Sequence, residues 1–509
     1  MLNSTRIQIL LLLFYIVAIC RQPHASGFKI EDCRALNETT NVTCYTPAKQ
    51  QFNIDFSNEE HIKIYIYQDK ESNTSTMFLT CQGSDEEVLH IGDNLPRLSL
   101  ERAKIITIDG CIPFEGIFKR LGLSVGTQVK LQRGITDMPL KREYLSSLTK
   151  VKSLLLGGFE ALDEHVLAGF ENLETLELTR IGTALPSGLL APVSAHLTQL
   201  NMRENNMTTP TKGLFASLQQ LDALDLSYNV LTSIPSGTFD QLYNLTVLDL
   251  SSNHLSHLPA DAFQSLRKLK RLFLSYNRIQ QLEPNTFVAL SALQDLKLDN
   301  NILDIATSVA CNIFDGLHSL EYMELNNNNL SVYCLPYNMR SVSVDLSFNK
   351  LKTLLLPPGE SEPRQSVNLN LRHNQLQYLS DETLQYLHDS LAQLSLAHNP
   401  WQCDTASFLW LDFIKLNSRR ILDLADVDCF NDNAYWNVTL FKPRKVCKSV
   451  TSLYYIITIA VVSALAITAL IAAVFYRRKA IKRVEKLKSA KQVENTYENV
   501  GYQVDQDVY

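Results

Sequence analysis

The sequence predicts an α/β-type solenoid. In this fold, short parallel strands stack into one concave sheet between disulfide-bonded end caps, and here a transmembrane helix and a disordered tail follow. Three observations support the prediction. A 24-residue phrase is repeated in tandem from Leu224, Leu248 and Leu272. An asparagine recurs in register in nine segments, and one uncharged apolar run of 23 residues lies near the C-terminal end.

The three phrases share the form LxLxxNxLxxLPxxxFxxLxxL. Its first two leucines alternate, so they place one face of a short strand in the core. The asparagine turns the chain, and its amide can bond backbone groups that a turning strand leaves unpaired. One coil cannot bury its own apolar face, so the coils must stack. The phrase resembles the leucine-rich repeat family at its extracellular-type length, and this resemblance implies a horseshoe.

The repeats extend well beyond these three copies. The first core position of ten coils falls at Leu176, Leu200, Leu224, Leu248, Leu272, Leu296, Met323, Val344, Leu369 and Leu394. The asparagine five residues later is present in nine of the ten, as Asn205, Asn229, Asn253, Asn277, Asn301, Asn328, Asn349, Asn374 and Asn399. We expect weaker coils to precede them at Ile106, Val129 and Leu154.

The two ends of the chain indicate a secreted and anchored topology. A basic residue and a short apolar run before Gly27 predict a signal peptide, the alternative being an uncleaved anchor. The run Leu453–Phe475 is long enough to span a bilayer, and the basic residues after it predict a cytoplasmic C-terminus. We therefore expect a single-pass type I protein of the plasma membrane with its N-terminus extracellular. The predicted domains are a signal peptide (1–26), an N-terminal cap (27–105), repeats (106–398), a C-terminal cap (399–448), a transmembrane helix (453–475) and a cytoplasmic tail (476–509).

Charge is unevenly distributed along the chain. The tail from Arg477 holds eight Lys or Arg against five Asp or Glu, so the predicted ectodomain is more acidic than the formal charge of −6 for the whole chain suggests. An acidic ectodomain argues against nucleic acid as a general partner and permits a basic protein ligand.

The N-terminal cap does not follow the repeat pattern. The alternating segment 61–67 and the apolar segment 76–81 predict a β-hairpin that covers the open edge of the first coil. Four cysteines lie in or next to this cap, and four cysteines can form two disulfides in three ways. Local spacing favours the combination Cys33–Cys44 with Cys81–Cys111. The hairpin and the segment 122–134 are faintly similar to the start of insect Toll-type ectodomains, whereas the Toll cytoplasmic domain is absent from this sequence.

Two interruptions stand out among the repeats. The coil from Leu296 has 27 residues and carries Cys311, and the next coil carries Cys334. Adjacent coils lie roughly 5 Å apart, which suits a disulfide, so we predict that Cys311 and Cys334 are bridged. The coil from Val344 contains a Pro-rich segment expected to form a convex-side loop. The alternative for both coils is an insertion without function.

The segment after Asn399, NPWQCDTASFLWL, resembles the cysteine-rich C-terminal cap of the leucine-rich repeat family. In that family, the first of four cysteines bonds the third, and the second bonds the fourth. The resemblance therefore implies a Cys403–Cys429 bond. Because Thr405 replaces the second cysteine, Cys447 is left without its partner. The alternatives for Cys447 are an intermolecular bond in a homodimer, a rearranged pairing with Cys403, or an unpaired thiol.

No enzyme motif is found, so the sequence predicts neither catalytic residues nor a metal or cofactor site. The chain is instead expected to bind an extracellular protein ligand or receptor through side chains at the outward positions of the strand segment. The predicted ligand face comprises Arg203, Tyr228, Phe273, Tyr276, Lys297, Phe348 and Arg372. The alternative is that strand propensity alone placed its aromatic residues. Predicted glycosylation sites are Asn37, Asn41, Asn73, Asn206, Asn244, Asn329 and Asn437.

The tail contains one readable motif, Tyr497-Glu-Asn-Val500, with Tyr502 close by. Tyr497 and Val500 resemble an endocytic sorting signal, and Tyr497 and Asn499 resemble a docking site for phosphotyrosine-binding adaptors; chance is the alternative. The sequence therefore predicts a membrane-embedded receptor with cytosolic adaptor or sorting partners. A homophilic adhesion molecule and a Toll-type co-receptor or decoy in innate immunity are the other candidates.

Overall fold

A computed structural model describes most of the chain from residue 139 to residue 439. Within this range, residues 147, 149, 211–212, 308–309, 336–340, 357–365, 404–407 and 432–433 are not described. Residues 41–45, 51–55, 62–68, 75–81, 103–110, 118, 128–132, 467–468 and 477–479 are also described. The chain divides into two compact units, Met1–Thr439 and Leu440–Tyr509, and the account below concerns the first.

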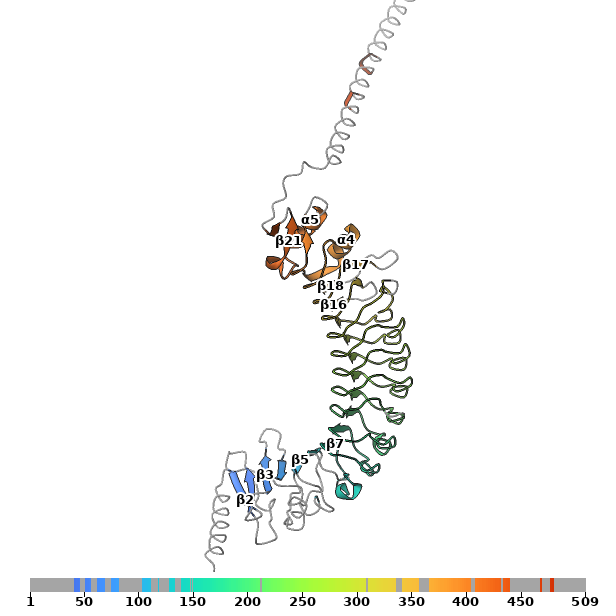
Figure 1. Ribbon diagram of the computed structural model, residues 1–509, viewed down its shortest axis with the longest axis vertical. Coiled ribbons are helices and arrows are strands. Elements are labelled where there is room, and N and C mark those ends of the chain that lie inside the picture. The colour runs from blue at the N-terminus through green and yellow to red at the C-terminus, as the bar shows by residue number, and fades with distance from the viewer. Residues whose placement is uncertain are drawn as a thin grey trace, which may run out of the picture. The chain divides into compact units, whose positions relative to one another are not determined.

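A fifteen-stranded sheet runs through the first unit in the order β19-β18-β16-β14-β13-β12-β11-β10-β9-β8-β7-β6-β5-β4-β3. In its first half the strands are β3 Ile62–Gln68, β4 Ser75–Cys81, β5 Ala103–Asp109, β6 Gln128–Gln132, β7 Ser153–Gly157, β8 Thr175–Thr179, β9 Gln199–Asn201 and β10 Ala223–Asp225. In its second half they are β11 Val247–Asp249, β12 Arg271–Phe273, β13 Asp295–Lys297, β14 Tyr322–Glu324, β16 Ser341–Asp345, β18 Ser366–Asn370 and β19 Leu391–Ser395. Figure 1 shows the stacked coils, with each strand beside the next.

The register of the sheet confirms the repeat assignment. Leu224 pairs with Leu200 on one side and with Leu248 on the other, and the same core position is matched through every parallel strand from Leu176 to Leu394. The weaker coils are also in register, because Ile106 pairs with Val129, which pairs with Leu154. The expected hairpin is present as well: β3 and β4 are antiparallel, and β4 continues the sheet into β5.

Shorter elements complete the coils. The return segments are mainly turns, with 3-10 helices η2 Arg142–Leu145 and η3 Ala191–Val193, a small parallel sheet of β15 Val332–Cys334 and β17 Thr353–Leu355, and helix α4 Asp381–Ser390. Strands β1 Asn41–Tyr45 and β2 Gln51–Asp55 pair with each other near the N-terminus. Helix α4 begins at Ser380, whose side chain accepts a hydrogen bond from the Thr383 N–H.

The core lies between the sheet and the return segments. The leucines of the strands are fully buried, and so is one phenylalanine from the return segment of successive coils. Phe263 stacks on Phe287 at 6.3 Å between ring centroids, and Phe287 stacks on Phe314 at 6.1 Å. Such ring pairs contribute stabilisation beyond the area that they bury, and here they join one coil to the next.

Each repeat asparagine bonds to two coils. Asn253 is 3% exposed, and its Nδ2 donates to the carbonyls of Leu226 and Leu250 at 3.0 and 3.1 Å. Its Oδ1 accepts the N–H of Leu231 in the preceding coil at 3.0 Å. The same arrangement recurs at the other asparagines of the series. The amide thus satisfies backbone groups that the turn would otherwise leave unpaired, as the sequence predicts.

The C-terminal cap closes the last coil. It consists of β20 Trp401–Gln402, α5 Phe408–Leu416, η5 Leu424–Asp426, β21 Asp428–Asn431 and β22 Ala434–Asn437. The carboxylate of Asp423, itself buried, accepts the N–H of Leu396 at 2.9 Å and that of Ala397 at 2.9 Å. In the other coils, the N–H equivalent to that of Leu396 bonds a carbonyl of the next coil, so Asp423 supplies the acceptor that a further coil would provide.

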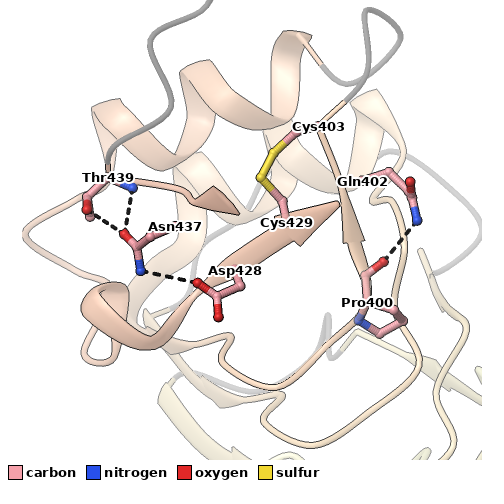
Figure 2. Close-up of a disulfide and its surroundings, with 7 residues drawn as sticks. All are labelled: Pro400, Gln402, Cys403, Asp428, Cys429, Asn437 and Thr439. Carbon is pink, nitrogen blue, oxygen red and sulfur yellow. Dashed lines mark hydrogen bonds between the residues drawn. A yellow bond between two sulfur atoms is a disulfide. The ribbon is translucent and has the colours of Figure 1, made fainter. Parts of the chain in front are cut away.

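Two disulfides are present among the described residues. Cys311 is bonded to Cys334, with their Cα atoms 4.9 Å apart, which agrees with the prediction made from coil spacing. Cys403 is bonded to Cys429, with a Cα separation of 5.6 Å, as the family resemblance implies. Figure 2 shows this second bond joining the end of β20 to β21. The predicted pairs Cys33–Cys44 and Cys81–Cys111, and Cys447, lie outside the described side chains.

No helix among the described residues is long and apolar enough to cross a membrane. Of the run Leu453–Phe475, only residues 467–468 are described, and they are helical. The predicted signal peptide and the tail motif at Tyr497, Asn499, Val500 and Tyr502 also lie outside the described residues, so these predictions remain as the sequence made them.

Candidate recognition face

Of the seven residues of the predicted ligand face, Phe273 and Lys297 lie in strands of the sheet, and the other five lie in the turns that follow the strands. In strands β10 to β13 the central leucine is buried and the two flanking residues point outward. These strands are only three residues long, and each ends one residue before the second leucine of the motif. The residues between that leucine and the asparagine therefore belong to the turn, whereas the sequence had assigned them to the outward strand face.

The residue before each repeat asparagine adopts a left-handed backbone. We call this series the turn column, and it also includes Arg180, which precedes Ile181 at the same position of the first coil. The column comprises Arg180, Glu204, Tyr228, Ser252, Tyr276, Asn300, Asn327, Phe348, His373 and His398, with φ between 54° and 60°. This region is uncommon for residues other than glycine. Here the N–H of each residue down to His373 bonds a carbonyl of the next coil, for example Tyr228 to Ser251 at 3.1 Å. Tertiary bonding thus holds a conformation that local preference disfavours.

Several large side chains in the turn column are exposed. Tyr228, Tyr276 and Phe348 are 56%, 61% and 52% exposed, respectively. Three of the predicted aromatic residues therefore project from a hydrogen-bonded backbone, because the left-handed turn aims them away from the core. The fourth, Phe273, lies in strand β12 and is half-buried.

A charged cluster occupies the middle of the sheet. The ammonium of Lys297 lies 2.8 Å from Glu324 Oε1 and 5.9 Å from the ring centroid of Phe273. Its hydrogen bond to Glu324 raises the pKa of Lys297, so the ammonium stays charged. Burial raises the pKa of the neighbouring Asp295 carboxyl, whose Oδ1 has no hydrogen-bond partner. Tyr322, 57% exposed, adds another aromatic side chain, which the sequence had not singled out.

A second group of interacting side chains lies in the turns that follow β9 and β10. The guanidinium of Arg203 lies 4.7 Å from the centroid of the Tyr228 ring, within the range of a cation–π contact. Its Nη2 is 3.3 Å from Glu204 Oε1. Arg203 and Tyr228 are therefore held against each other on adjacent coils, as a preformed pair of a cation and an aromatic ring.

Three rings stack at the C-terminal end of the turn column. Phe348 and His373 have ring centroids 4.2 Å apart with planes at 11°, and His373 and His398 are 4.2 Å apart at 23°. We call these three residues the ring ladder. Burial lowers the pKa of His373, and the neighbouring His398 and Arg372 lower it further. The sequence pointed to Phe348 and Arg372 but missed His398, although its place before Asn399 marks it as the next member of the series.

The aspartates of the sheet have a structural role. The carboxylates of Asp225, Asp249 and Asp345 each accept the backbone N–H of the serine two residues later, at 2.8 Å. Each is thereby occupied in shaping its own turn. Burial raises the pKa of Asp249, and its bonds to Ser251 oppose that shift. Among the described residues, no group of three or more His, Cys, Asp or Glu could hold a metal ion.

The described glycosylation candidates differ in their surroundings. Asn206 is exposed, and Asn244, Asn329 and Asn437 are half-buried. Asn244 Nδ2 donates to the carbonyl of Gln219 at 2.8 Å, and Asn437 Nδ2 donates to that of Ala425 at 2.7 Å. Figure 2 shows Asn437 between Asp428 and Thr439. Asn437 Nδ2 also donates to Asp428 Oδ1 at 3.4 Å, so a glycan on this amide would have to displace a hydrogen bond, whereas the Asn206 side chain is open to solvent.

The comparison with protein families addresses the repeats directly. A leucine rich repeat family model matches residues 195–255 and 243–303. This chain is a leucine-rich repeat protein. No curated relative matches it. A solenoid of this kind is typical of proteins that bind ligands or act as scaffolds, and its strands and turns carry the contacts.

Three solved leucine-rich repeat structures are similar to the chain. A TLR13–ssRNA13 complex matches with 20% identity and a TM-score of 0.41, covering 71% of this chain and 62% of that one. An LRIM1/APL1C complex matches with 19% identity, a TM-score of 0.42, and coverage of 78% and 80%. FLRT2 in a complex with latrophilin 3 and Unc5D matches with 23% identity, a TM-score of 0.42, and coverage of 58% and 82%. This chain thus spans less than two thirds of the TLR13 chain. At such identities and TM-scores, none of the three bears on what this chain binds.

Proposed function

We propose that this leucine-rich repeat protein is a type I cell-surface receptor that binds an extracellular protein ligand on the outward surface of its sheet. One observation carries the proposal: Tyr228, Tyr276 and Phe348 project from a left-handed turn that neighbouring coils hold by hydrogen bonds, and more than half of each side chain is exposed. Exposed aromatic side chains on a rigid support are the usual source of binding energy in protein interfaces.

The electrostatics of the face favour a protein partner. Lys297 is engaged by Glu324, and Arg203 lies over Tyr228, so several of its charges are already paired. Such a surface lacks the unpaired row of cations that phosphate recognition requires. A partner could cover the tyrosines and leave the ion pairs at the solvent-exposed rim of the interface. It would then bury apolar surface without burying an unpaired charge.

The membrane and tail parts of the proposal rest on sequence. Leu453–Phe475 is an uncharged run of 23 residues followed by basic residues, and Tyr497 lies in the tail beyond it. We infer that the run anchors the chain and that Tyr497, with Asn499 or Val500, recruits an adaptor or the endocytic machinery. Surface biotinylation of cells that express Tyr497→Phe tests the tail: slower uptake than wild type supports sorting, and unchanged uptake and adaptor recovery refute the role.

An affinity capture experiment tests the ligand face. The Gly27–Lys448 ectodomain is immobilised, and captured proteins are compared with those on Tyr276→Ala, Phe348→Ala and Tyr243→Ala. Tyr243 is a matched control, since it is 48% exposed and lies in a return segment. A specific ligand should be lost on Tyr276→Ala or Phe348→Ala and kept on Tyr243→Ala. Equal capture by all four proteins would refute binding through this face, and capture of the chain itself would indicate homophilic adhesion.

Covalent dimerisation through Cys447 is a separate proposal. Cys447 precedes the apolar run by six residues, so two anchored chains could be joined there. Non-reducing electrophoresis of wild type and Cys447→Ser decides the point. A band of twice the mass that disappears in the variant supports the dimer, and a monomer in wild type refutes it.

A further inference from the structure

The ring ladder differs from the other aromatic groups of the face because it is continuous over three coils. Phe348, His373 and His398 occupy the same position in successive coils, and their backbone fixes the direction of each ring. Phe348 and His398 are exposed, whereas His373, which lies between them, is half-buried. The three side chains therefore present one continuous strip of ring edges to solvent.

The charged groups around the ladder are already engaged. On the face of these three coils they are Asp345 and Arg372. Asp345 accepts from Ser347 N at 2.8 Å and from Asn370 Nδ2 at 3.1 Å, and Arg372 Nε lies 3.5 Å from Asp423 Oδ2. From the cap, Asp423 is bound to two backbone N–H groups, while the nearby Arg420 bonds His388 and Asn417. The exposed Asp426 follows Asp423 in the same segment. None of these carboxylates forms an ion pair with either imidazole of the ladder.

We propose that the ring ladder is a docking surface for an apolar or aromatic side chain of a protein ligand, and that docking requires both imidazoles to be neutral. The proposal deepens the receptor function proposed above and rests on it. An uncharged partner group fits because the charges at the rim already have partners, so a charged group would be dehydrated there without compensation. A planar ring can pack edge-to-face against the ring edges that the ladder exposes.

A dependence on pH follows from this geometry. A ligand that covers the rings removes water from the imidazoles, which disfavours their charged forms and lowers their pKa values. His373 already starts from a lowered pKa because of burial, His398 and Arg372. Protons therefore bind the free ladder better than the covered one, and binding must weaken as the pH falls. Each imidazole that must be neutral in the complex weakens binding by up to about tenfold for each pH unit below its own pKa in the free chain.

A fluorinated aromatic probe tests the ladder without knowledge of the ligand. The full-length chain in lipid nanodiscs is titrated with N-acetyl-5-fluorotryptophanamide, and binding is followed by the 19F signal of the probe at pH 7.5 and pH 5.5. Wild type should bind at the higher pH and lose affinity at the lower pH, because docking on protonated imidazoles is disfavoured. Phe348→Ala should weaken binding at pH 7.5, whereas Tyr243→Ala should not.

Two further measurements keep the proposal open to refutation. The double variant His373→Gln, His398→Gln should retain the fold by circular dichroism and bind the probe with equal affinity at both pH values. In the wild-type chain labelled with 13C in the histidine rings, the probe should shift two ring signals and leave those of His254 and His257 unchanged. Unchanged affinity between the two pH values, equal binding by wild type and Phe348→Ala, or preferential binding of N-acetylaspartate amide would each overturn the proposal.

The outcomes separate this inference from the receptor function. If Tyr276→Ala abolishes ligand capture but the probe binds wild type and Phe348→Ala equally, the receptor function stands and the ladder proposal fails. If the probe binds as expected and no variant of the face changes ligand capture, the ladder binds aromatic groups and the receptor function fails.

Discussion

Asn253→Ala removes one member of the asparagine series and tests how much each contributes to stability. The substitution deletes hydrogen bonds to the carbonyls of Leu226 and Leu250 and leaves the N–H of Leu231 without an acceptor. Three bonds at about 1 kcal/mol each, with a further 1–2 kcal/mol or so for a buried unpaired N–H, give a loss of about 4 kcal/mol. This is a large part of the roughly 5–15 kcal/mol that stabilises a typical domain.

The measurement is urea unfolding of the ectodomain by circular dichroism, combined with amide hydrogen exchange. Because each coil contacts only its neighbours, exchange should accelerate most in the coils on either side of residue 253. Ser256→Ala is the matched control, since Ser256 is exposed and its side chain has no recorded partner; its effect should stay within about 0.5 kcal/mol. A loss below about 1 kcal/mol in Asn253→Ala would show that water replaces the amide at little cost, and would refute the reasoning.

Three further predictions follow from the described contacts. Asp423→Ala should cost about 3 kcal/mol and speed the exchange of two amides in the last coil, because it removes charge-assisted bonds from the cap; exchange as slow as in wild type would contradict this. Gly316→Ala should cost about 2 kcal/mol in thermal unfolding, because φ is +95° and a Cβ would lie 2.7 Å from the carbonyl oxygen of Val288, whereas Gly188→Ala, with no atom within 4 Å of its Cβ, should be nearly neutral. Asp249→Asn should be neutral or stabilising by under about 1 kcal/mol at pH 7, with the advantage shrinking as the pH falls, because burial raises the pKa of Asp249 and so disfavours its charged form in the folded state; a clear loss at pH 7 would argue against this.

The register of the solenoid could be predicted from sequence because it depends on local, periodic residues. The leucine and the asparagine of each coil have one structural task each, and both recur at nearly constant spacing, so Leu224 and Leu248 had to be neighbours. The Cys311–Cys334 bond could be predicted because the two cysteines lie in adjacent coils, which are close enough for a disulfide.

Features that depend on several coils could not be predicted in the same way. The left-handed backbone at Tyr228 is imposed by hydrogen bonds from the next coil, and an aromatic residue gives no local signal for it. The stacking of His373 on His398 depends on the direction in which that backbone aims the rings. Asp423 lies outside the periodic region, so nothing in its local sequence indicates that it closes the last coil.

The turn column separates the stability of the solenoid from the chemistry of its surface. Ten residues as different as arginine, glutamate, tyrosine, serine, asparagine, phenylalanine and histidine adopt the same backbone there, and in nine of them it is held by a bond to a main-chain carbonyl of the adjoining coil. A substitution at one of these positions therefore changes the surface chemistry at that position and leaves the main-chain bonds between coils in place. A molecule built in this way can acquire a new specificity one residue at a time, with no need to refold around it.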